Sequence, residues 1–177
     1  MDVNLKVNDY EVSLGMPLNP SGLAGAGIRK MGFLANAFMP IKKFPGDTLY
    51  WIKNPVISCF DERVEMCSPR DRSMDADMMY GTAAYLFFNR NGLRYVILQV
   101  MASYFAADMF TSSLREAASE MLGPAEKCDY TDLPCAYRGI TSSKPFHLRY
   151  AWLADGQSLV SEIGPSGKSA FLHWQHQ

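Results

Sequence analysis

Residues 82–101 read TAAYLFFNRNGLRYVILQVM, and this stretch decides the fold class. Two apolar runs, 82–88 and 93–101, flank the tetrapeptide Asn89-Arg90-Asn91-Gly92. An Asn-Gly pair between such runs supplies the positive φ angles that tight hairpin turns require. The two runs are therefore predicted to pair as an antiparallel hairpin.

The register of this hairpin follows from a four-residue loop, which places Phe88 opposite Leu93 and Phe87 opposite Arg94. Both faces are then largely apolar, so the hairpin is predicted to lie in the middle of its sheet. One face carries Phe88, Leu86 and Ala84 with Leu93, Tyr95 and Ile97, and the other carries Phe87, Tyr85 and Ala83 with Arg94, Val96 and Leu98.

A helix is predicted after the hairpin, from about residue 113 to residue 122. Ser113 and Glu116 have the spacing of a capping box, and Gly123-Pro124 supplies a stop. The apolar residues between these signals recur at helical spacing and predict a stripe that covers a sheet. They are Leu114, Ala117, Ala118, Met121 and Leu122.

Three more strands are predicted at the C-terminal end, over about 146–153, 158–163 and 168–174. Apolar and polar residues alternate in the first, which is typical of a half-buried strand. The turns fall at Asp155-Gly156 and Gly164-Pro165-Ser166-Gly167. Pairing across them puts Trp152, Leu159 and Leu172 in one row, on the face shared by Leu148, Tyr150, Ile163, Ala170 and Trp174. The opposite face, predicted to be solvated or to face a partner, carries His147, Arg149, Leu153, Val160, Glu162, Ser169, Phe171 and His173.

The first 60 residues are predicted to be mostly irregular, because glycines and prolines interrupt every periodic pattern. The pattern permits one helix within about 27–38 and short strands at 48–52 and 56–60. The prediction is thus an α+β fold, mainly an antiparallel sheet, with a ββαβββ order in the C-terminal two-thirds. One domain is expected over 1–177, with the hairpin, helix and three-stranded meander in 78–177.

Composition places the chain among soluble globular domains, since 48% of its 177 residues are hydrophobic and 20% are charged. The net charge of −1 argues against nucleic acid as a partner unless a local basic patch exists. Arg94 and Gln99 interrupt the longest apolar stretch, 92–107, so no membrane span is expected. Residues 1–6 lack the pattern of a secretory signal, which favours the cytoplasm, although an exported form with its signal removed stays open.

The cysteines number four and leave two interpretations open, free buried thiols or two disulfides. If they pair, we expect Cys59 with Cys67 and Cys128 with Cys135, because each couple lies within one short segment of the chain. Neither couple has the close spacing of a structural zinc site, so no metal is expected.

Catalytic and cofactor motifs do not emerge from the chain. Residues 164–169 end like a phosphate-binding loop, but Glu162 stands where the first glycine belongs and too few residues follow for the helix. No nucleophile elbow or zinc-protease motif is found, and no cofactor is expected. This favours a non-catalytic protein and leaves open an enzyme whose residues are scattered along the chain.

A binding segment is the best candidate for function. Residues 61–132 hold twelve acids and seven bases, a local net charge of −5, and the acids gather between 61 and 77. Such a field steers a basic protein partner. The candidate contact residues are Asp61, Glu62, Glu65, Asp71, Asp75 and Asp77. A second candidate surface carries Arg149 and Glu162, which are predicted to face each other across two strands.

The layout of a Gly/Pro-rich front, a hairpin, a helix and an aromatic meander is similar to that of many small bacterial proteins, which include immunity proteins against rival toxins. The resemblance implies a protein-binding module, such as an inhibitor or an immunity-type partner of a toxin or enzyme. The alternative is a protein that binds a small molecule or lipid, because aromatic residues make up 12% of the chain and methionines number eleven.

Overall fold

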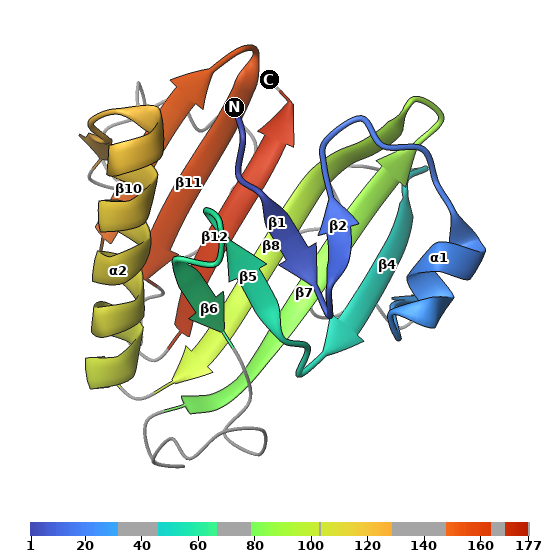
Figure 1. The fold of residues 1–177 in the computed structure, drawn as a ribbon, viewed down its shortest axis with the longest axis horizontal. Helices are drawn as coiled ribbons and strands as arrows, with labels where there is room; N and C mark the ends of the chain where they lie inside the picture. Colours follow the sequence, from blue (N-terminus) through green and yellow to red (C-terminus); the bar gives the residue numbers. More distant parts are fainter. Residues whose placement is uncertain (32–45, 67–78, 103, 129–147, 164–168, 177) are drawn as a thin grey trace.

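Two antiparallel sheets and a long helix form most of the structure (Figure 1). The structure is a computed structural model that describes residues 1–31, 46–66, 79–102, 104–128, 148–163 and 169–176. The fold is α+β and mainly antiparallel sheet, as predicted from the sequence.

The large sheet has eight strands. Their spatial order is β3 (Arg29–Lys30), β4 (Thr48–Lys53), β7 (Met79–Asn89), β8 (Gly92–Ala102), β12 (Ser169–His176), β11 (Gln157–Ile163), β10 (Leu148–Ala154) and β9 (Glu126–Cys128). The predicted central hairpin, β7–β8, does lie in the interior of this sheet. Strand β9 was not predicted. The order from β7 to the last strand is therefore ββαββββ rather than ββαβββ.

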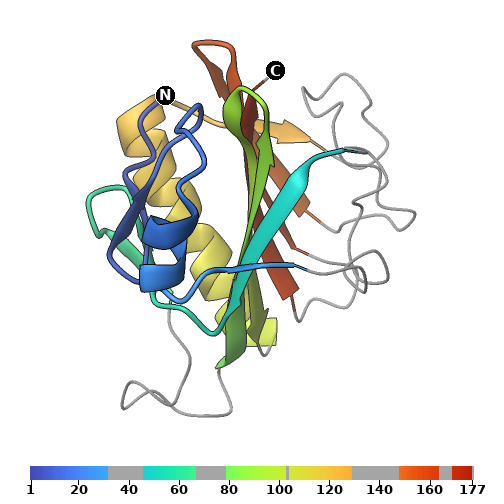
Figure 2. The same ribbon diagram turned by 90° about the vertical axis from the view of Figure 1, so that its right-hand side faces the viewer.

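The small sheet has four strands and lies on one face of the large sheet, together with the two helices (Figures 1 and 2). Its order is β2 (Tyr10–Val12), β1 (Leu5–Val7), β5 (Ile57–Cys59) and β6 (Val64–Met66). The helices are α1 (Pro20–Gly25) and α2 (Tyr104–Leu122). The main core forms between these elements and the large sheet, where Leu5, Phe60, Val96, Leu114 and Leu159 belong to one buried cluster.

The N-terminal part is more regular than predicted. Residues 5–12 form a hairpin whose turn, Asn8-Asp9, has positive φ at both residues, the requirement of a tight hairpin turn. Helix α1 begins after the cap Asn19, with Pro20 in its first turn, and Gly27 has a φ of +80° shortly after its end. The prediction of a helix within 27–38 was wrong for its first residues, since 29–30 form β3, and 32–38 lie outside the described residues.

The strands predicted at 48–52 and 56–60 are confirmed as β4 and β5. They belong to different sheets, although only three residues separate them. In the acid-rich segment 61–77, a turn at 61–63 leads into strand β6, and 67–77 lies outside the described residues.

A β-bulge at Arg94 overturns the predicted hairpin register. Phe88 pairs with Leu93 as predicted, but Phe87 pairs with Tyr95, so Arg94 is one extra residue on β8. The backbone of Leu93 is bonded to a different segment, since its N–H donates to the Met16 carbonyl and its carbonyl accepts from Gly15. Every residue of β8 after Leu93 therefore faces the opposite side from the prediction.

Helix α2 begins nine residues before the predicted start, at Tyr104 rather than Ser113. Ser113 and Glu116 are exposed within the helix and do not cap it. The buried stripe runs through Ala107, Thr111, Leu114 and Ala118, whose spacing of four, three and four residues is helical. The predicted stop is confirmed, because Gly123 has a φ of +92° directly after Leu122.

The meander is confirmed with one shift of register. Trp152 pairs with Leu159 as predicted, but the next residue in the row is Trp174, and Leu172 pairs with Ser161. A shift of two residues keeps the facing of every side chain, so the apolar residues still join the core against α2. The turn at Asp155-Gly156 is confirmed by positive φ at both residues, and the turn predicted at 164–167 lies outside the described residues.

Candidate functional site

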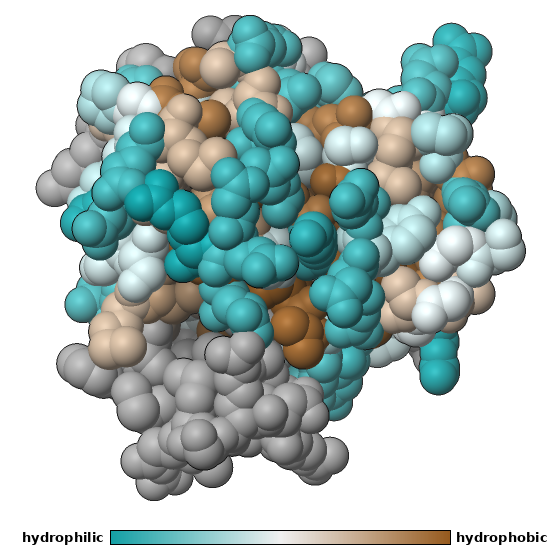
Figure 3. All heavy atoms as spheres, in the orientation of Figure 1, coloured by the Kyte–Doolittle hydropathy of each residue, from teal (hydrophilic) through white to brown (hydrophobic). Residues whose placement is uncertain are grey.

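A hollow of about 540 Å³ opens where the small sheet meets the ends of β11 and β12. Segments far apart in the sequence enclose it: the N-terminal strands, the β5–β6 turn and the last strand. Its lining residues are Met1, Asp2, Asn4, Leu5, Lys6, Glu11, Val12, Ser13, Leu14, Asp61, Glu62, Gln157 and Trp174. On the face of the molecule viewed in Figure 3, hydrophilic side chains dominate around the small sheet.

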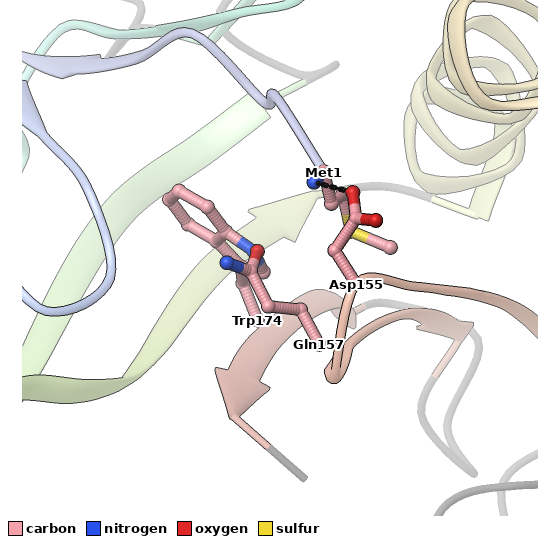
Figure 4. Close-up of polar contacts among 4 residues, drawn as sticks. All are labelled: Met1, Asp155, Gln157 and Trp174. Atoms are coloured by element: carbon pink, nitrogen blue, oxygen red, sulfur yellow. Dashed lines mark hydrogen bonds and ion pairs between the residues drawn. The ribbon is translucent and has the colours of Figure 1, made fainter.

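The floor of the hollow is apolar and held in place by the core. Leu5, Val12 and Trp174 are buried members of the main core cluster. The Trp174 indole N–H donates a hydrogen bond of 3.0 Å to Oε1 of Gln157, which fixes the ring (Figure 4). A guest in the hollow thus meets a rigid apolar surface.

The rim is acidic. Four carboxylates, those of Asp2, Glu11, Asp61 and Glu62, lie around the hollow with a single lysine, Lys6. The Lys6 ammonium is 3.4 Å from Glu62, and the two side chains are 36% and 68% exposed, so this ion pair is weak. The rim therefore keeps an excess of negative charge.

The β5–β6 turn presents two of these carboxylates from a strained backbone. Phe60, Asp61 and Glu62 all have positive φ angles of 54–64°. Non-glycine residues in this region cost about 1 kcal/mol or more each and persist only where surrounding contacts hold them. Here the Phe60 side chain is fully buried, its N–H donates to the Val3 carbonyl, and Asp61 accepts a 2.7 Å hydrogen bond from Asn4. The turn is anchored at its base while its carboxylates stay exposed.

The first residue closes one end of the hollow. The amino group of Met1 lies 2.7 Å from Oδ2 of Asp155 in the β10–β11 turn (Figure 4). The pKa of Asp155 is lowered below its ordinary value, mainly by this hydrogen bond and to a smaller extent by the positive charge of the amino group.

The predicted contact residues divide into three groups. Asp61 and Glu62 line the hollow, and Glu65 is exposed on β6 outside it. Asp71, Asp75 and Asp77 lie outside the described residues. The second candidate pair, Arg149 and Glu162, lies in register across β10 and β11 as predicted.

Glu162 is nevertheless not on a solvated face, which corrects the prediction. Its exposed fraction is 0%, and Val160 and His173 on the same face are buried as well. Of that predicted face, Leu153 is exposed. A partner therefore cannot reach the Glu162 carboxylate in this conformation.

A chain of hydrogen bonds links Glu162 to two residues that the sequence interpretation did not connect. His173 Nε2 lies 2.9 Å from Oε2 of Glu162, and His173 Nδ1 lies 2.8 Å from the Tyr95 hydroxyl. The bonds run diagonally across β11, β12 and β8, because Tyr95 pairs with Gln175 and His173 pairs with Val160. All three side chains are buried, so we call them the buried polar triad.

The triad packs among buried apolar side chains on the second face of the large sheet. Leu49, Phe87, Ile97, Ala151 and Val160 form a buried cluster with Tyr95 there. The ring of Tyr95 stacks on Phe87 at 5.0 Å and on His173 at 6.2 Å between centroids. Buried polar groups require such hydrogen-bond partners, since each unpaired group costs about 1–3 kcal/mol. The triad is well suited to specify the packing of this face.

Metal sites and pockets lined mainly by aromatic residues and methionines are not found in the described part of the chain. No group of three or more His, Cys, Asp or Glu side chains there is placed to hold a metal ion. The described hollows contain few aromatic residues and methionines: the largest has Met1 and Trp174, and a hollow of about 330 Å³ has Trp51. None of the described helices is long and apolar enough to cross a membrane.

Cys59 is a free thiol, so the disulfide considered between Cys59 and Cys67 is not formed. Its side chain lies in the main core, and burial raises its pKa to about 12. A thiol that stays protonated at neutral pH is a poor nucleophile. Cys135 lies outside the described residues, so its pairing with Cys128 stays a prediction.

Compared with known protein families, with curated proteins and with solved structures, the chain matches none.

Proposed function

We propose that this protein is a non-catalytic protein-binding module and that the acidic hollow binds a basic segment of its partner. An inhibitor or an immunity-type partner of a toxin or enzyme is one form of such a module. The observation that carries the proposal is the pairing of an apolar floor with an acidic rim in one hollow of about 540 Å³.

Lysine and arginine side chains match both parts of this hollow. Each side chain has an aliphatic stem that can pack on the apolar floor and a cationic head that can stay at the acidic rim of the hollow. The floor around Trp174 suits the stem, and the carboxylates of Asp61 and Glu62 suit the head. Residues 61–132 carry a net charge of −5, and such an acid excess would speed the encounter with a basic partner.

The anchored β5–β6 turn supports the same proposal. Its backbone strain is held by Phe60 and by the hydrogen bond from Asn4, so both carboxylates are positioned before a partner arrives. Preorganised groups lose less conformational entropy on binding.

The test begins with co-purification from the native host and identification of the bound protein by mass. Association rates of that partner are then measured at two salt concentrations for the double variant Asp61→Asn/Glu62→Gln. We expect the on-rate at low salt to fall by about tenfold and its salt dependence to flatten.

The matched control is Asp108→Asn/Glu116→Gln, which removes two exposed carboxylates of α2 and changes the net charge equally. Its on-rate should stay within about twofold of the parent protein. An equal effect of both double variants would show that only the net charge matters, and an unchanged rate in the first would remove the hollow from the interface.

A further inference from the structure

A second surface with the opposite charge lies at the β3 edge of the large sheet. Among the described strands, β3 is the end strand of the sheet, and β4 is its one partner. A hollow of about 330 Å³ lies beside this pair, lined by Gly27, Arg29, Trp51, Ile52 and Lys53. Its described lining residues include two cations, one large aromatic ring and no acid, and we call it the edge hollow.

The sheet register aligns the ring and the cations on one face. Arg29 pairs with Trp51 across β3 and β4, and Trp51 pairs with Tyr85 across β4 and β7. Lys53 lies two residues further along β4, so its side chain points to the same side as Trp51. The rings of Trp51 and Tyr85 are nearly parallel, with an interplanar angle of 14° and centroids 6.4 Å apart. They form a supported, partly exposed aromatic platform.

The two cations are unpaired, in contrast to several others on this protein. Within the described part of the chain, Arg29 and Lys53 have neither an ion pair nor a hydrogen bond from their side chains, and both are exposed. Lys6, Arg63 and Arg94 each contact a carboxylate instead. Unpaired positive charge beside an aromatic platform stands out on a chain whose net charge is −1.

Gly27 helps to keep this surface open. A Cβ atom at this position would already contact the Ile52 side chain at 3.4 Å, and its φ of +80° disfavours any other residue. A larger side chain here would therefore fill part of the edge hollow.

We propose that the edge hollow binds a nucleoside phosphate, either free or as one nucleotide of a single strand. The base would stack on Trp51, because every nucleobase has a planar face and such stacking tolerates different bases. The phosphate would lie between Arg29 and Lys53, where the arginine fork can donate two parallel hydrogen bonds. This surface is the local basic patch without which the net charge argues against nucleic acid.

The composition of the patch favours this ligand over a protein. Protein interfaces are centred on a desolvated apolar core. The large apolar side chains exposed in the described residues, Leu18, Val56, Met101, Met109 and Leu153, do not line the edge hollow. Both of its charged side chains are positive, so an anionic planar ligand is the complementary partner.

Tryptophan fluorescence offers a direct test. The chain has three tryptophans, and two of them, Trp152 and Trp174, are only 3% and 4% exposed. A stacked base therefore quenches mainly Trp51. We expect adenosine 5′-monophosphate to give saturable quenching, adenosine to bind at least tenfold more weakly, and inorganic phosphate to compete without quenching.

Variants separate the two contacts. Arg29→Gln/Lys53→Gln should weaken binding of adenosine 5′-monophosphate at least tenfold, whereas Arg90→Gln in the exposed β7–β8 turn should leave it within twofold. Trp51→Leu should weaken binding at least fivefold. Because this variant lacks the Trp51 fluorescence, its binding is measured by titration calorimetry. Circular dichroism confirms that each variant folds, and Tyr85→Phe keeps the platform and should bind normally.

A ten-residue deoxyadenosine strand distinguishes the two sources. Binding at least tenfold tighter than the mononucleotide, with affinity that falls steeply as salt rises, assigns the site to single-stranded nucleic acid. Equal affinities assign it to free nucleotides. The proposal is overturned if neither probe quenches saturably at millimolar concentration, if Arg29→Gln/Lys53→Gln binds as tightly as the parent, or if phosphate alone binds as tightly as the nucleotide.

Discussion

The two faces of the large sheet are built by the same strands but bury different chemistry. On the face toward α2 and the small sheet, the buried side chains of β8, β11 and β12 include Val96, Leu98, Leu159 and Leu172 and form an apolar core. On the other face the same strands bury the polar triad of Tyr95, His173 and Glu162 beside apolar neighbours.

This difference separates two ways of stabilising a sheet. An apolar face needs only volume and contact, so many side chains of similar size satisfy it. A buried polar face depends on its hydrogen bonds, because each lost partner takes a bond away from a buried group. On the apolar face, we therefore expect the loss of stability after a side-chain truncation to increase with the size of the cavity. On the polar face, we expect it to increase with the number of broken hydrogen bonds.

The largest effect is expected on the apolar face. Leu159→Ala removes a side chain that is fully buried against α2 and should lower the free energy of unfolding by about 2–5 kcal/mol. Urea unfolding followed by circular dichroism measures the change. Leu153→Ala, on the neighbouring strand at a position 47% exposed, should change it by less than about 0.5 kcal/mol. Similar losses in both variants would contradict the observed facing of the meander.

The next effect is expected in the polar triad. His173→Phe conserves a planar ring but removes the partner of both the Tyr95 hydroxyl and the Glu162 carboxylate, so we expect a loss of about 2–3 kcal/mol. Tyr95→Phe removes the hydrogen bond between the Tyr95 hydroxyl and His173 and should cost about 1 kcal/mol. A loss below about 0.5 kcal/mol for His173→Phe would mean that this face does not depend on its polar network.

The smallest effect is a pH dependence that arises in the main core, at Cys59 of the small sheet. Burial raises the pKa of Cys59 to about 12 in the folded protein, whereas an unfolded cysteine has its ordinary pKa of 9.0. Between these values the folded state holds the proton more tightly, so stability decreases as pH rises. The free energy of unfolding should fall by about 1 kcal/mol from pH 9 to pH 10 because of this residue.

Cys59→Ala provides the control for this titration. The variant lacks the thiol, so the fall between pH 9 and pH 10 should be smaller by the same amount, although burial of Tyr85 also raises that residue's pKa and leaves a separate alkaline titration. Equal slopes in the two proteins would show that Cys59 is reached by water in the folded state.

Local signals in the sequence predicted the elements that depend on neighbouring residues. The turn of the central hairpin, the turn at Asp155-Gly156 and the stop at Gly123 are all present, with positive φ at Gly92, Asp155, Gly156 and Gly123. Each depends on a backbone conformation that only certain residues adopt readily. The hairpin at 5–12 carried the same kind of signal, since Asn8-Asp9 lies between two alternating segments, but the signal is short and the glycines and prolines that begin at Gly15 dominated the interpretation of this region.

The acidic side of the candidate site was only partly predictable. Asp61 and Glu62 stood out through the charge of their segment, whereas Asp2 and Glu11 did not, because they join the rim only through the small sheet. The edge hollow had no signal along the chain, since Arg29, Trp51 and Lys53 become neighbours through the pairing of β3 with β4.

The sequence by itself determined where most strands begin and turn and which residues of the meander share a face, because period-two alternation and turn chemistry are local. Only the tertiary structure decided which side of the large sheet each residue of β8 faces, since bonds from Gly15 and Met16 to Leu93 accompany the bulge at Arg94. It also decided that Glu162 and His173 are buried. Burial depends on which segments cover a sheet face, and a local sequence pattern does not predict those segments.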